Sequence, residues 1–224
     1  MRRVAFLLIF GLAGTALLVG LGVWQVQRLN WKAAILAEID SRISGPAIAL
    51  PADPDPARDR YLGVEVTGEI LPGEVLVLVS RKQIGAGYRV IAPFLTGDGR
   101  RILLDRGFIR AADRDAPRDT GPVTVTGNLD WPREIDRFTP APDLDGGVWF
   151  ARDVPAMAQA LGTDPVLLVA RTGTGPDPMP VDSSGIPNDH LNYAITWFSL
   201  AAIWAAMTGY FLWRNRARTE GDRT

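Results

Sequence analysis

Two uncharged apolar stretches lie near the ends of the chain. Residues 4–24 and 193–213 each run for 21 positions without Asp, Glu, Lys or Arg. A helix of that length, at about 1.5 Å per residue, spans the roughly 30 Å hydrocarbon layer of a bilayer. The pattern therefore predicts transmembrane helices at residues 4–26 and 190–213. A cleavable signal peptide is the alternative for the first stretch, but its apolar run continues past the small residues at 12–16, which favours a retained anchor.

The charges that flank these stretches predict an orientation. Arg2 and Arg3 precede the first stretch, and Arg214, Arg216 and Arg218 follow the second. Because cytoplasmic flanks collect Lys and Arg, residues 1–3 and 214–224 are expected in the cytoplasm and residues 27–189 outside it. No Arg- and Ser-rich transit segment precedes the first stretch, which favours a bacterial plasma membrane and a periplasmic central domain.

Between the apolar stretches, the hydrophobic pattern changes to a period of two. Alternation over 61–70 is typical of a strand, and β-branched or apolar runs suggest further strands at 75–79, 88–95, 102–109, 123–129 and 166–170. Residues 96–99 (Thr-Gly-Asp-Gly) predict a hairpin turn, and 154–161 a helix with Asp153 as its N-cap and Gly162 as its stop. Pro-rich linkers occupy 46–56, 132–142 and 173–187. We expect a β-rich (α+β) domain, a small barrel or a sandwich.

The amino-acid composition excludes several classes of site and argues against several functions. The 224 residues include no Cys, which excludes thiolate metal sites, thiol nucleophiles and disulfides. The net charge is -1, and residues 27–192 are acidic, with 18 Lys+Arg against 23 Asp+Glu, so nucleic-acid binding is not expected. Neither a nucleophile elbow nor a phosphate loop is present, so an enzyme is not expected; an anchored hydrolase would require an acid pair that no motif singles out.

The single His lies where the last linker meets the second apolar stretch. His190, Trp197 and Trp204 are seven residues apart and share a narrow stripe on a helix, with Tyr193 beside it. Imidazole is a common axial ligand of haem iron, and indole rings could cover a flat apolar cofactor. The alternative is that Tyr193 and Trp24 belong to the aromatic belts of a membrane protein and His190 is a head-group residue.

Two further helix-surface patterns are weaker. Arg28 and Lys32 are four residues apart and could pair with haem propionates, but lipid phosphates are the more common partner of such cations. Small residues recur every four positions, which would allow the two apolar helices to approach closely. They are Ala16 and Gly20 in the first stretch, and Ala201, Ala205 and Gly209 in the second.

Taken together, these residues resemble the surfeit locus protein one (Surf-one, or Shy-one) family of cytochrome c oxidase assembly factors. The resemblance runs nearly end to end, and the segment 187–198, Pro-Asn-Asp-His-Leu-Asn-Tyr-Ala-Ile-Thr-Trp-Phe, is its most specific part. The other matching positions are 21–25 (Leu-Gly-Val-Trp-Gln), Arg28, 31–32 (Trp-Lys), 87–88 (Gly-Tyr), 93–94 (Pro-Phe), 103–108 (Leu-Leu-Asp-Arg-Gly-Phe), Trp149 and 152–153 (Arg-Asp).

The resemblance implies a non-enzymatic protein that binds haem a as transient cargo and assists its insertion into oxidase subunit I. It implies His190 as the iron ligand and Trp197 as a packing partner, with Tyr193, Arg28 and Trp24 as further candidates for cofactor binding. Subunit I and the lipid bilayer are the expected partners, and haem a synthase is a further candidate. A scaffold that stabilises subunit I without binding haem is the alternative.

The sequence departs from the family pattern at two places. Asp189 stands where the family commonly has a second Asn, and Phe108-Ile109 replaces the usual Trp-Val. A carboxylate beside His190 would either orient the imidazole or face water.

Overall fold

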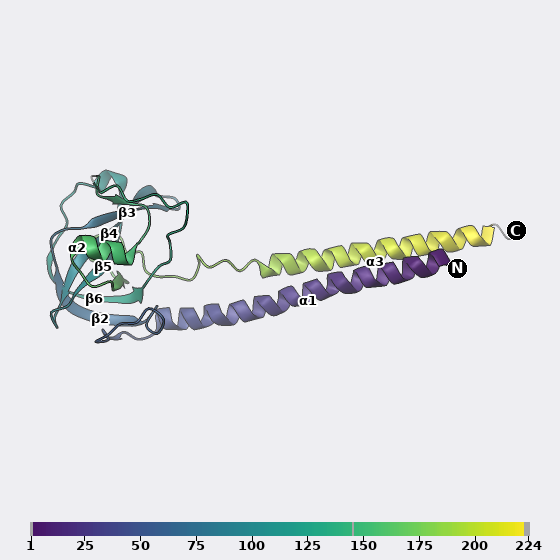
Figure 1. The fold of residues 1–224 in the computed structure, drawn as a ribbon, viewed down its shortest axis with the longest axis horizontal. Coiled ribbons are helices and arrows are strands. Elements are labelled where there is room, and N and C mark those ends of the chain that lie inside the picture. Colours follow the sequence, from purple (N-terminus) through teal and green to yellow (C-terminus); the bar gives the residue numbers. More distant parts are fainter. Residues whose placement is uncertain (1, 145, 222–224) are drawn as a thin grey trace. The chain divides into compact units, whose positions relative to one another are not determined.

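The computed structural model describes residues 2–144 and 146–221 and divides into two compact units. One unit comprises residues 1–38 and 184–224, and the other comprises 39–183. Each unit is described by itself below (Figure 1). The elements are α1 (Arg2–Ser44), β1 (Ile48–Ala49), β2 (Gly63–Ile70), β3 (Val75–Arg81), β4 (Gly85–Thr96), β5 (Arg101–Arg110), the 3-10 helix Ala111–Asp113, β6 (Gly121–Asp130), β7 (Val148–Trp149), α2 (Val154–Leu161), β8 (Leu167–Ala170) and α3 (His190–Gly221).

The central unit is built on one sheet whose pairings close into a ring. The strand order is β1-β2-β6-β8-β5-β4-β3-β7, and the C-terminal end of β4 also pairs with β2. The hydrogen-bonded circuit β2-β6-β8-β5-β4 therefore returns to β2. Most neighbours are antiparallel, and three pairs run parallel: β1 with β2, β3 with β7, and β5 with β8.

Two apolar clusters flank this sheet. One cluster gathers side chains of β2, β4, β5, β6 and β8, including Phe94 and Leu104, which are fully buried. The other lies under α2, where Met157 packs with Ile91 and Leu103. Leu103 and Leu104 belong to different clusters, which shows that both faces of β5 are buried; every residue from Ile102 to Ile109 is buried.

The strand predictions from the sequence are confirmed, with ends that differ by no more than three residues. Helix α2 has the predicted bounds, 154–161. Its N-cap Asp153 accepts a hydrogen bond from the Ala156 amide (3.1 Å), and Gly162 ends the helix in the left-handed conformation. The hairpin at 96–99 is confirmed by the hydrogen bond from the Thr96 amide to the Arg100 carbonyl. Two strands were missed, β1 inside the first Pro-rich linker and β7, since two residues carry no readable alternation.

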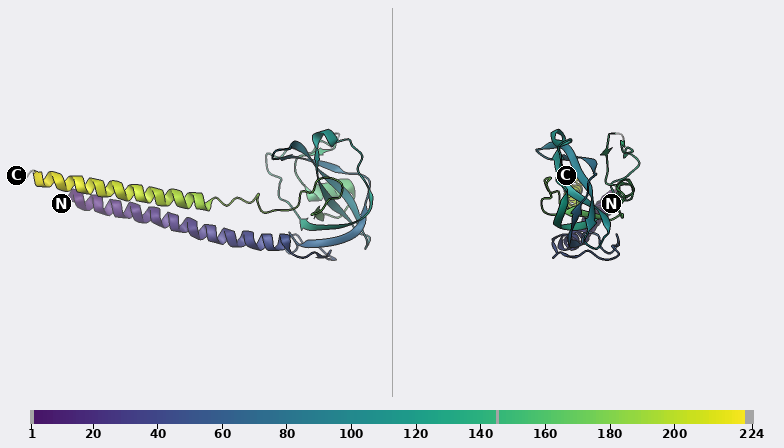
Figure 2. Two further views of the ribbon diagram at one scale, coloured as in Figure 1. Left: turned by 180° about the vertical axis from the view of Figure 1, so that it is seen from behind. Right: turned by 90° about the vertical axis from the view of Figure 1, so that its left-hand side faces the viewer.

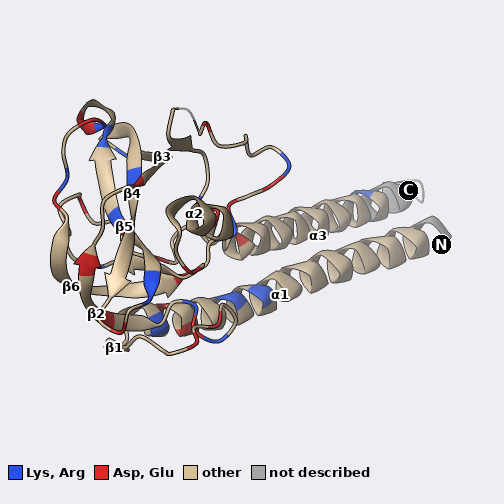
Figure 3. Ribbon diagram, turned by 60° about the vertical axis from the view of Figure 1, so that its left-hand side comes forward, with Lys and Arg blue, Asp and Glu red and all other residues tan. Residues whose placement is uncertain are grey.

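The other unit consists of the two long helices, which lie side by side in both orientations of Figures 1 and 2. Both are long and apolar enough to cross a membrane, and only 6% of each apolar window is buried, unlike the core helix of a soluble protein. In Figure 3 the ribbon of α3 stays tan between its start and its last turns, while the colours of charged residues gather in the second half of α1. These helices fit a membrane protein.

The helices meet along positions that recur every seven residues. On α1 the buried or half-buried positions include Gly11, Leu18 and Gln25, and on α3 they include Ala194, Ala201 and Thr208. A seven-residue repeat is typical of helices that pack side by side with a small crossing angle. We call this line of contact the seam.

The predicted pattern of small residues was wrong in its details. Ala201 is buried in the seam, but Ala16 and Ala205 are exposed, and a Cβ at Gly20 or Gly209 would meet nothing within 4 Å. The close approach occurs instead at Gly11, Gly14 and Gly22, where an added Cβ would lie 2.2–2.7 Å from Thr208, Trp204 and Phe198. Spacing alone does not reveal which face of a helix meets its neighbour.

Candidate functional site

His190 begins α3 and is hydrogen-bonded to the other apolar helix. Its Nδ1 lies 2.8 Å from Oε1 of Gln25, which is 8% exposed. A carbonyl oxygen only accepts, so Nδ1 is the donor in this arrangement, and in a neutral imidazole the lone pair is then on Nε2. This is the tautomer that a histidine needs in order to bind a metal through Nε2.

A second polar group beside His190 lacks a partner. The side-chain oxygen of Asn188 is buried and accepts no hydrogen bond from any described residue. Buried acceptors are nearly always satisfied, by protein, water or ligand. Asn188 thus supplies an acceptor without a donor, and His190, two residues later, supplies an imidazole nitrogen, Nε2, that is outside the bond to Gln25.

The aromatic stripe that follows His190 lies on the seam. Trp197 and Trp204 are half-buried, and the Trp204 indole donates a hydrogen bond to the Gly11 carbonyl (3.1 Å) while packing on Gly14 and on the Phe10 ring. Trp204 is therefore engaged in packing the two helices together. No hydrogen bond or ring contact of Trp197 occurs among the described residues, and it is the seam aromatic nearest to His190.

The remaining predicted site residues lie on exposed helix surface. Tyr193 is 56% exposed and Trp24 is 50% exposed. The Arg28 guanidinium lies over the Trp31 ring, 4.6 Å from its centroid. The structure thus joins His190 to Gln25 and does not join it to Tyr193, Trp24 or Arg28 by any described polar contact.

An apolar groove follows the seam further along the helices. Its volume is about 570 Å³, and its lining residues are apolar apart from the Trp204 nitrogen. They are Phe10, Ala13, Gly14, Leu17, Leu18, Leu200, Ile203, Trp204 and Met207. His190 is ten residues before the first α3 residue of this groove, so the groove and the histidine are separate features.

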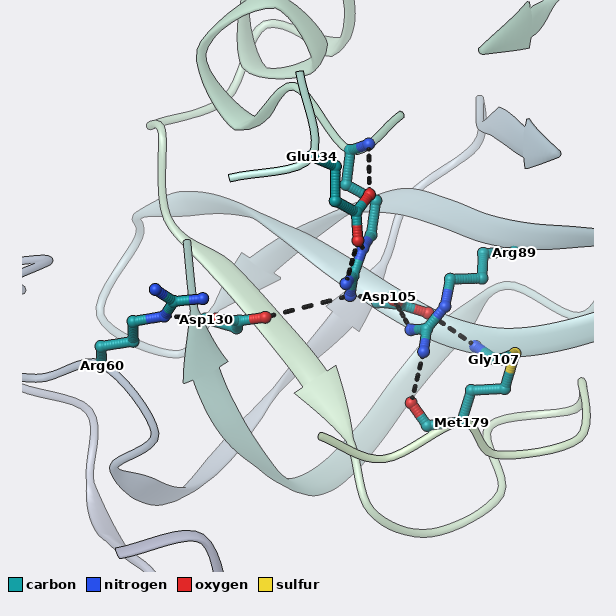
Figure 4. A network of polar contacts seen from close by, with 8 residues as sticks. Arg60, Arg89, Asp105, Gly107, Asp130, Glu134 and Met179 are labelled. Carbon is teal, nitrogen blue, oxygen red and sulfur yellow. Dashed lines mark hydrogen bonds and ion pairs between the residues drawn. The ribbon is translucent and has the colours of Figure 1, made fainter. Parts of the chain in front are cut away.

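The central domain holds a buried network of alternating charges (Figure 4). Asp105, which is 1% exposed, is paired with Arg89 and lies 3.7 Å from Nη1 of Arg152. Arg152 also pairs with Glu134 and approaches Asp130, whose carboxylate is held by Arg60 at 3.0 Å.

The network includes one residue from each of two motifs noted in the sequence: Asp105 from 103–108 and Arg152 from 152–153. Its three arginines and three carboxylates are matched in charge, and Arg89 in addition donates to the Met179 carbonyl at 3.0 Å. Burial acts to raise the pKa of Glu134, but the hydrogen bonds and charge of Arg152 outweigh it and hold that pKa below its usual value. Each carboxylate of the network therefore has at least one arginine as its partner.

Sequence reasoning overlooked the roles of Gln25 and Asn188. Both stand in segments quoted for the family resemblance, but a glutamine in an apolar helix carries no signal of its partner. The only clue was spacing, since Gln25 continues the seven-residue series of Gly11 and Leu18. A polar residue on the buried face of an apolar helix is expected to find a hydrogen-bond partner on its neighbour.

The fold and this site define a class of protein: two apolar helices that fit a membrane, a strand-rich domain between them in sequence, and a polar interhelical pair at the start of the second helix. Residues 12–202 match the family model described as the SURF1 family, and the chain belongs to that family. It is 30% identical to surfeit locus protein 1 of Rattus norvegicus, in an alignment that covers 89% of this chain and 72% of the relative.

Bacterial and human relatives show similar levels of identity. A SURF1-like protein of Rickettsia bellii is 32% identical over 93% of this chain and 90% of its own length. Surfeit locus protein 1 of Homo sapiens is 29% identical, over 82% of this chain and 70% of its own length. The resemblance inferred from the motifs is thereby confirmed.

Proposed function

We propose that this protein is a cytochrome c oxidase assembly factor that binds haem a through His190 and assists its insertion into oxidase subunit I. Membership of the SURF1 family supports the assembly role. The observation that carries the haem-binding part is the hydrogen bond between His190 Nδ1 and Gln25, because it leaves Nε2 available as an iron ligand.

The residues around His190 fit a haem group. Neutral imidazole is a suitable ligand, the half-buried Trp197 offers an apolar surface, and the unsatisfied Asn188 oxygen could accept a hydrogen bond. Gln25 orients the imidazole and sets its tautomer. The haem supplies the iron centre, and these residues hold and position it until transfer.

The location is part of the proposal. We infer a bacterial plasma membrane protein with both termini in the cytoplasm and the strand-rich domain in the periplasm. The basic residues outside the two apolar helices and the Rickettsia relatives support this orientation and source. The ring of strand pairings supports the small barrel over the sandwich. Subunit I and haem a synthase are the proposed partners.

A scaffold that stabilises subunit I without haem is the second candidate. The observation that favours it is that the seam uses its polar groups internally: Trp204 bonds to Gly11, and His190 bonds to Gln25. Interhelical hydrogen bonds of this kind also serve simply to hold apolar helices together.

The deciding experiment is a reduced-minus-oxidised visible spectrum with pigment extraction, on full-length protein co-expressed with haem a synthesis. We expect stoichiometric haem a in the wild type and its loss in His190→Ala. In Gln25→Leu we expect about a tenfold or greater loss of haem affinity, as is usual when the partner of a ligating histidine is removed. Gln27→Leu is the matched control, since Gln27 is exposed on the same helix.

The two candidates give different results. A folded wild-type protein without haem would contradict haem binding and leave the scaffold in place. If haem survives in His190→Ala with an unchanged spectrum, another residue is the ligand.

A further inference from the structure

Arg106 belongs to the same β5 motif as Asp105, but it is not part of the buried charge network. It is 2% exposed and follows Asp105 directly. In the pairing of β5 with β4, Gly107 is opposite Val90 and Asp105 is opposite Ile91, so Arg106 is the extra residue of a β-bulge. Bulges re-aim side chains and are common next to functional sites.

The backbone after the bulge fixes where the Arg106 side chain goes. Gly107 has φ +113, and a Cβ there would lie 2.1 Å from the carbonyl oxygen of Asp177, so the segment around 174–178 can cross β5 only at a glycine. That segment supplies the hydrogen bonds of Arg106: its Nε (3.1 Å) and Nη2 (2.6 Å) both donate to the Thr174 carbonyl.

In the described part of the chain, Arg106 has no carboxylate in direct contact, although the charges of Glu74 and Asp119 act favourably on it from a longer distance. None of the described residues forms an ion pair with it, in contrast to Arg89 and Arg152. Its two hydrogen bonds leave Nη1 unused, and burial lowers the pKa of the guanidinium below its usual value. A buried charge whose only hydrogen-bond acceptor is a backbone carbonyl is costly, and an anion in direct contact would offset that cost.

A hollow adjoins this side chain. Its volume is about 330 Å³, within the range of small-molecule sites of about 300–1,000 Å³. The β2–β3 turn and the segment before β6 form its walls, and it contains Arg106, Arg118 and Glu74. Arg118 and Glu74 neutralise each other, with Arg118 Nε 2.9 Å from both carboxylate oxygens. The positive charge of Arg106 is therefore the excess charge of the hollow's lining.

The geometry points to an oxyanion site in the central domain, in which Arg106 binds the oxygens of a carboxylate or phosphate group that enters the hollow beside Glu74 and Arg118. Arginine presents several donors in a planar fork and is well suited to both groups. The site is independent of His190 and of haem. It would allow the domain to hold an acidic group of a small molecule or of a partner.

The test uses the full-length protein in detergent and follows its thermal midpoint, Tm, by tryptophan fluorescence. Sodium phosphate and, separately, sodium acetate are titrated at constant ionic strength made up with sodium chloride. A ligand that binds the folded state raises Tm in a saturable manner. We expect such a rise for the wild type, with phosphate alone identifying a phosphate site and a rise with acetate as well identifying a carboxylate site.

Three variants locate the effect. Arg106→Gln should abolish the saturable rise. Glu74→Gln removes the carboxylate of the hollow and should lower the half-saturating anion concentration about tenfold, the effect of removing one nearby like charge at an intermediate dielectric constant. Lys82→Gln, which removes an exposed cation from the β3–β4 turn, should titrate like the wild type.

If Arg106→Gln does not fold, Glu74→Gln and Lys82→Gln still test the site. A lower half-saturating anion concentration in Glu74→Gln than in Lys82→Gln supports it. Equal, non-saturating increases in Tm for all folded variants are what excluded salts produce, and they would overturn the site.

Discussion

Glu134 is the most exposed carboxylate of the buried charge network, and its role depends on pH. Arg152 holds it through its side chain and through its backbone amide, at 2.9 Å. Since these contacts keep the folded-state pKa below the ordinary value of 4.5, the carboxylate stabilises the domain at pH values above about 4.5. That stabilisation is lost as the pH falls through the lowered pKa of the folded state.

A Glu134→Gln substitution tests this dependence. At pH 7 we expect the free energy of unfolding to fall by about 1–2 kcal/mol, a value limited by the partial exposure of the pair. Below pH 4.5 the difference from the wild type should shrink, because protonated Glu and Gln are alike in charge. Thermal unfolding from pH 7 to pH 3 measures both.

Glu65→Gln is the matched control, since Glu65 is an exposed carboxylate on β2 whose only described hydrogen bond is a 3.3 Å contact with Thr126. It should track the wild type within about 0.5 kcal/mol. A gap between Glu134→Gln and the wild type that stays constant with pH would contradict the proposed role of the ionised group.

At the scale of elements, the seam between α1 and α3 makes a geometric prediction. A Cβ at position 11 would lie 3.0 Å from the Cβ of Thr208, near the 3.5–4.5 Å that a disulfide requires. Because the chain has no Cys, Gly11→Cys combined with Thr208→Cys should form a disulfide on oxidation. Cleavage at a protease site inserted beside the exposed Leu144 should then leave the two fragments joined on a non-reducing gel.

The pair Gly20→Cys and Thr208→Cys should remain unlinked, since Gly20 meets nothing within 4 Å. Gly14→Leu should reduce linkage of the first pair, because its side chain would displace the Trp204 ring. Equal linkage at positions 11 and 20 would show that the helices do not keep the seam described here.

The elements differ in how well the sequence predicted them, for physical reasons. Strands β2 to β6 carry alternation or apolar runs over five or more residues, so the local pattern was sufficient to predict them. The strands β1 and β7 exist only because β2 and β3 offer open edges to them. Such pairing depends on tertiary structure and leaves no local signal.

The candidate site was predicted in part. The seven-residue spacing of His190, Trp197 and Trp204 placed them on one face, and the structure turns that face toward α1. The partner of His190 was not predictable, because a hydrogen bond between helices 165 residues apart in sequence depends on their register. The hollow beside Arg106 was not predictable, because the segments that line it come together only in the folded domain.

At the scale of the whole molecule, the central unit begins inside a helix. The last turn of α1 belongs to it, and the Ile43 carbonyl accepts hydrogen bonds from Asn128 (3.1 Å) and from Arg171. The Gly45 carbonyl accepts from Arg171 as well, at 3.3 Å. These contacts tie the end of α1 to β6 and to the residue that follows β8.

We therefore expect residues 39–183 to fold alone and to be more stable than residues 46–183. The shorter fragment lacks the acceptors of Arg171, and its free energy of unfolding should be about 1–3 kcal/mol lower in urea denaturation. Arg171→Leu should destabilise the longer fragment more than the shorter one, since the two changes remove the same contacts. Equal stability of the two fragments would show that the end of α1 contributes nothing to the fold.

The ring of strand pairings has a consequence for the tendency of the protein to aggregate. A sheet with long free edges recruits strands from other molecules, which leads to aggregation. Here each strand of the circuit β2-β6-β8-β5-β4 pairs with a neighbour on both sides. The short strands β1 and β7 pair with β2 and β3, and β3 is followed by the cations Arg81 and Lys82 at its C-terminal end. Few free strand edges therefore remain in the described domain for pairing with another copy of the chain.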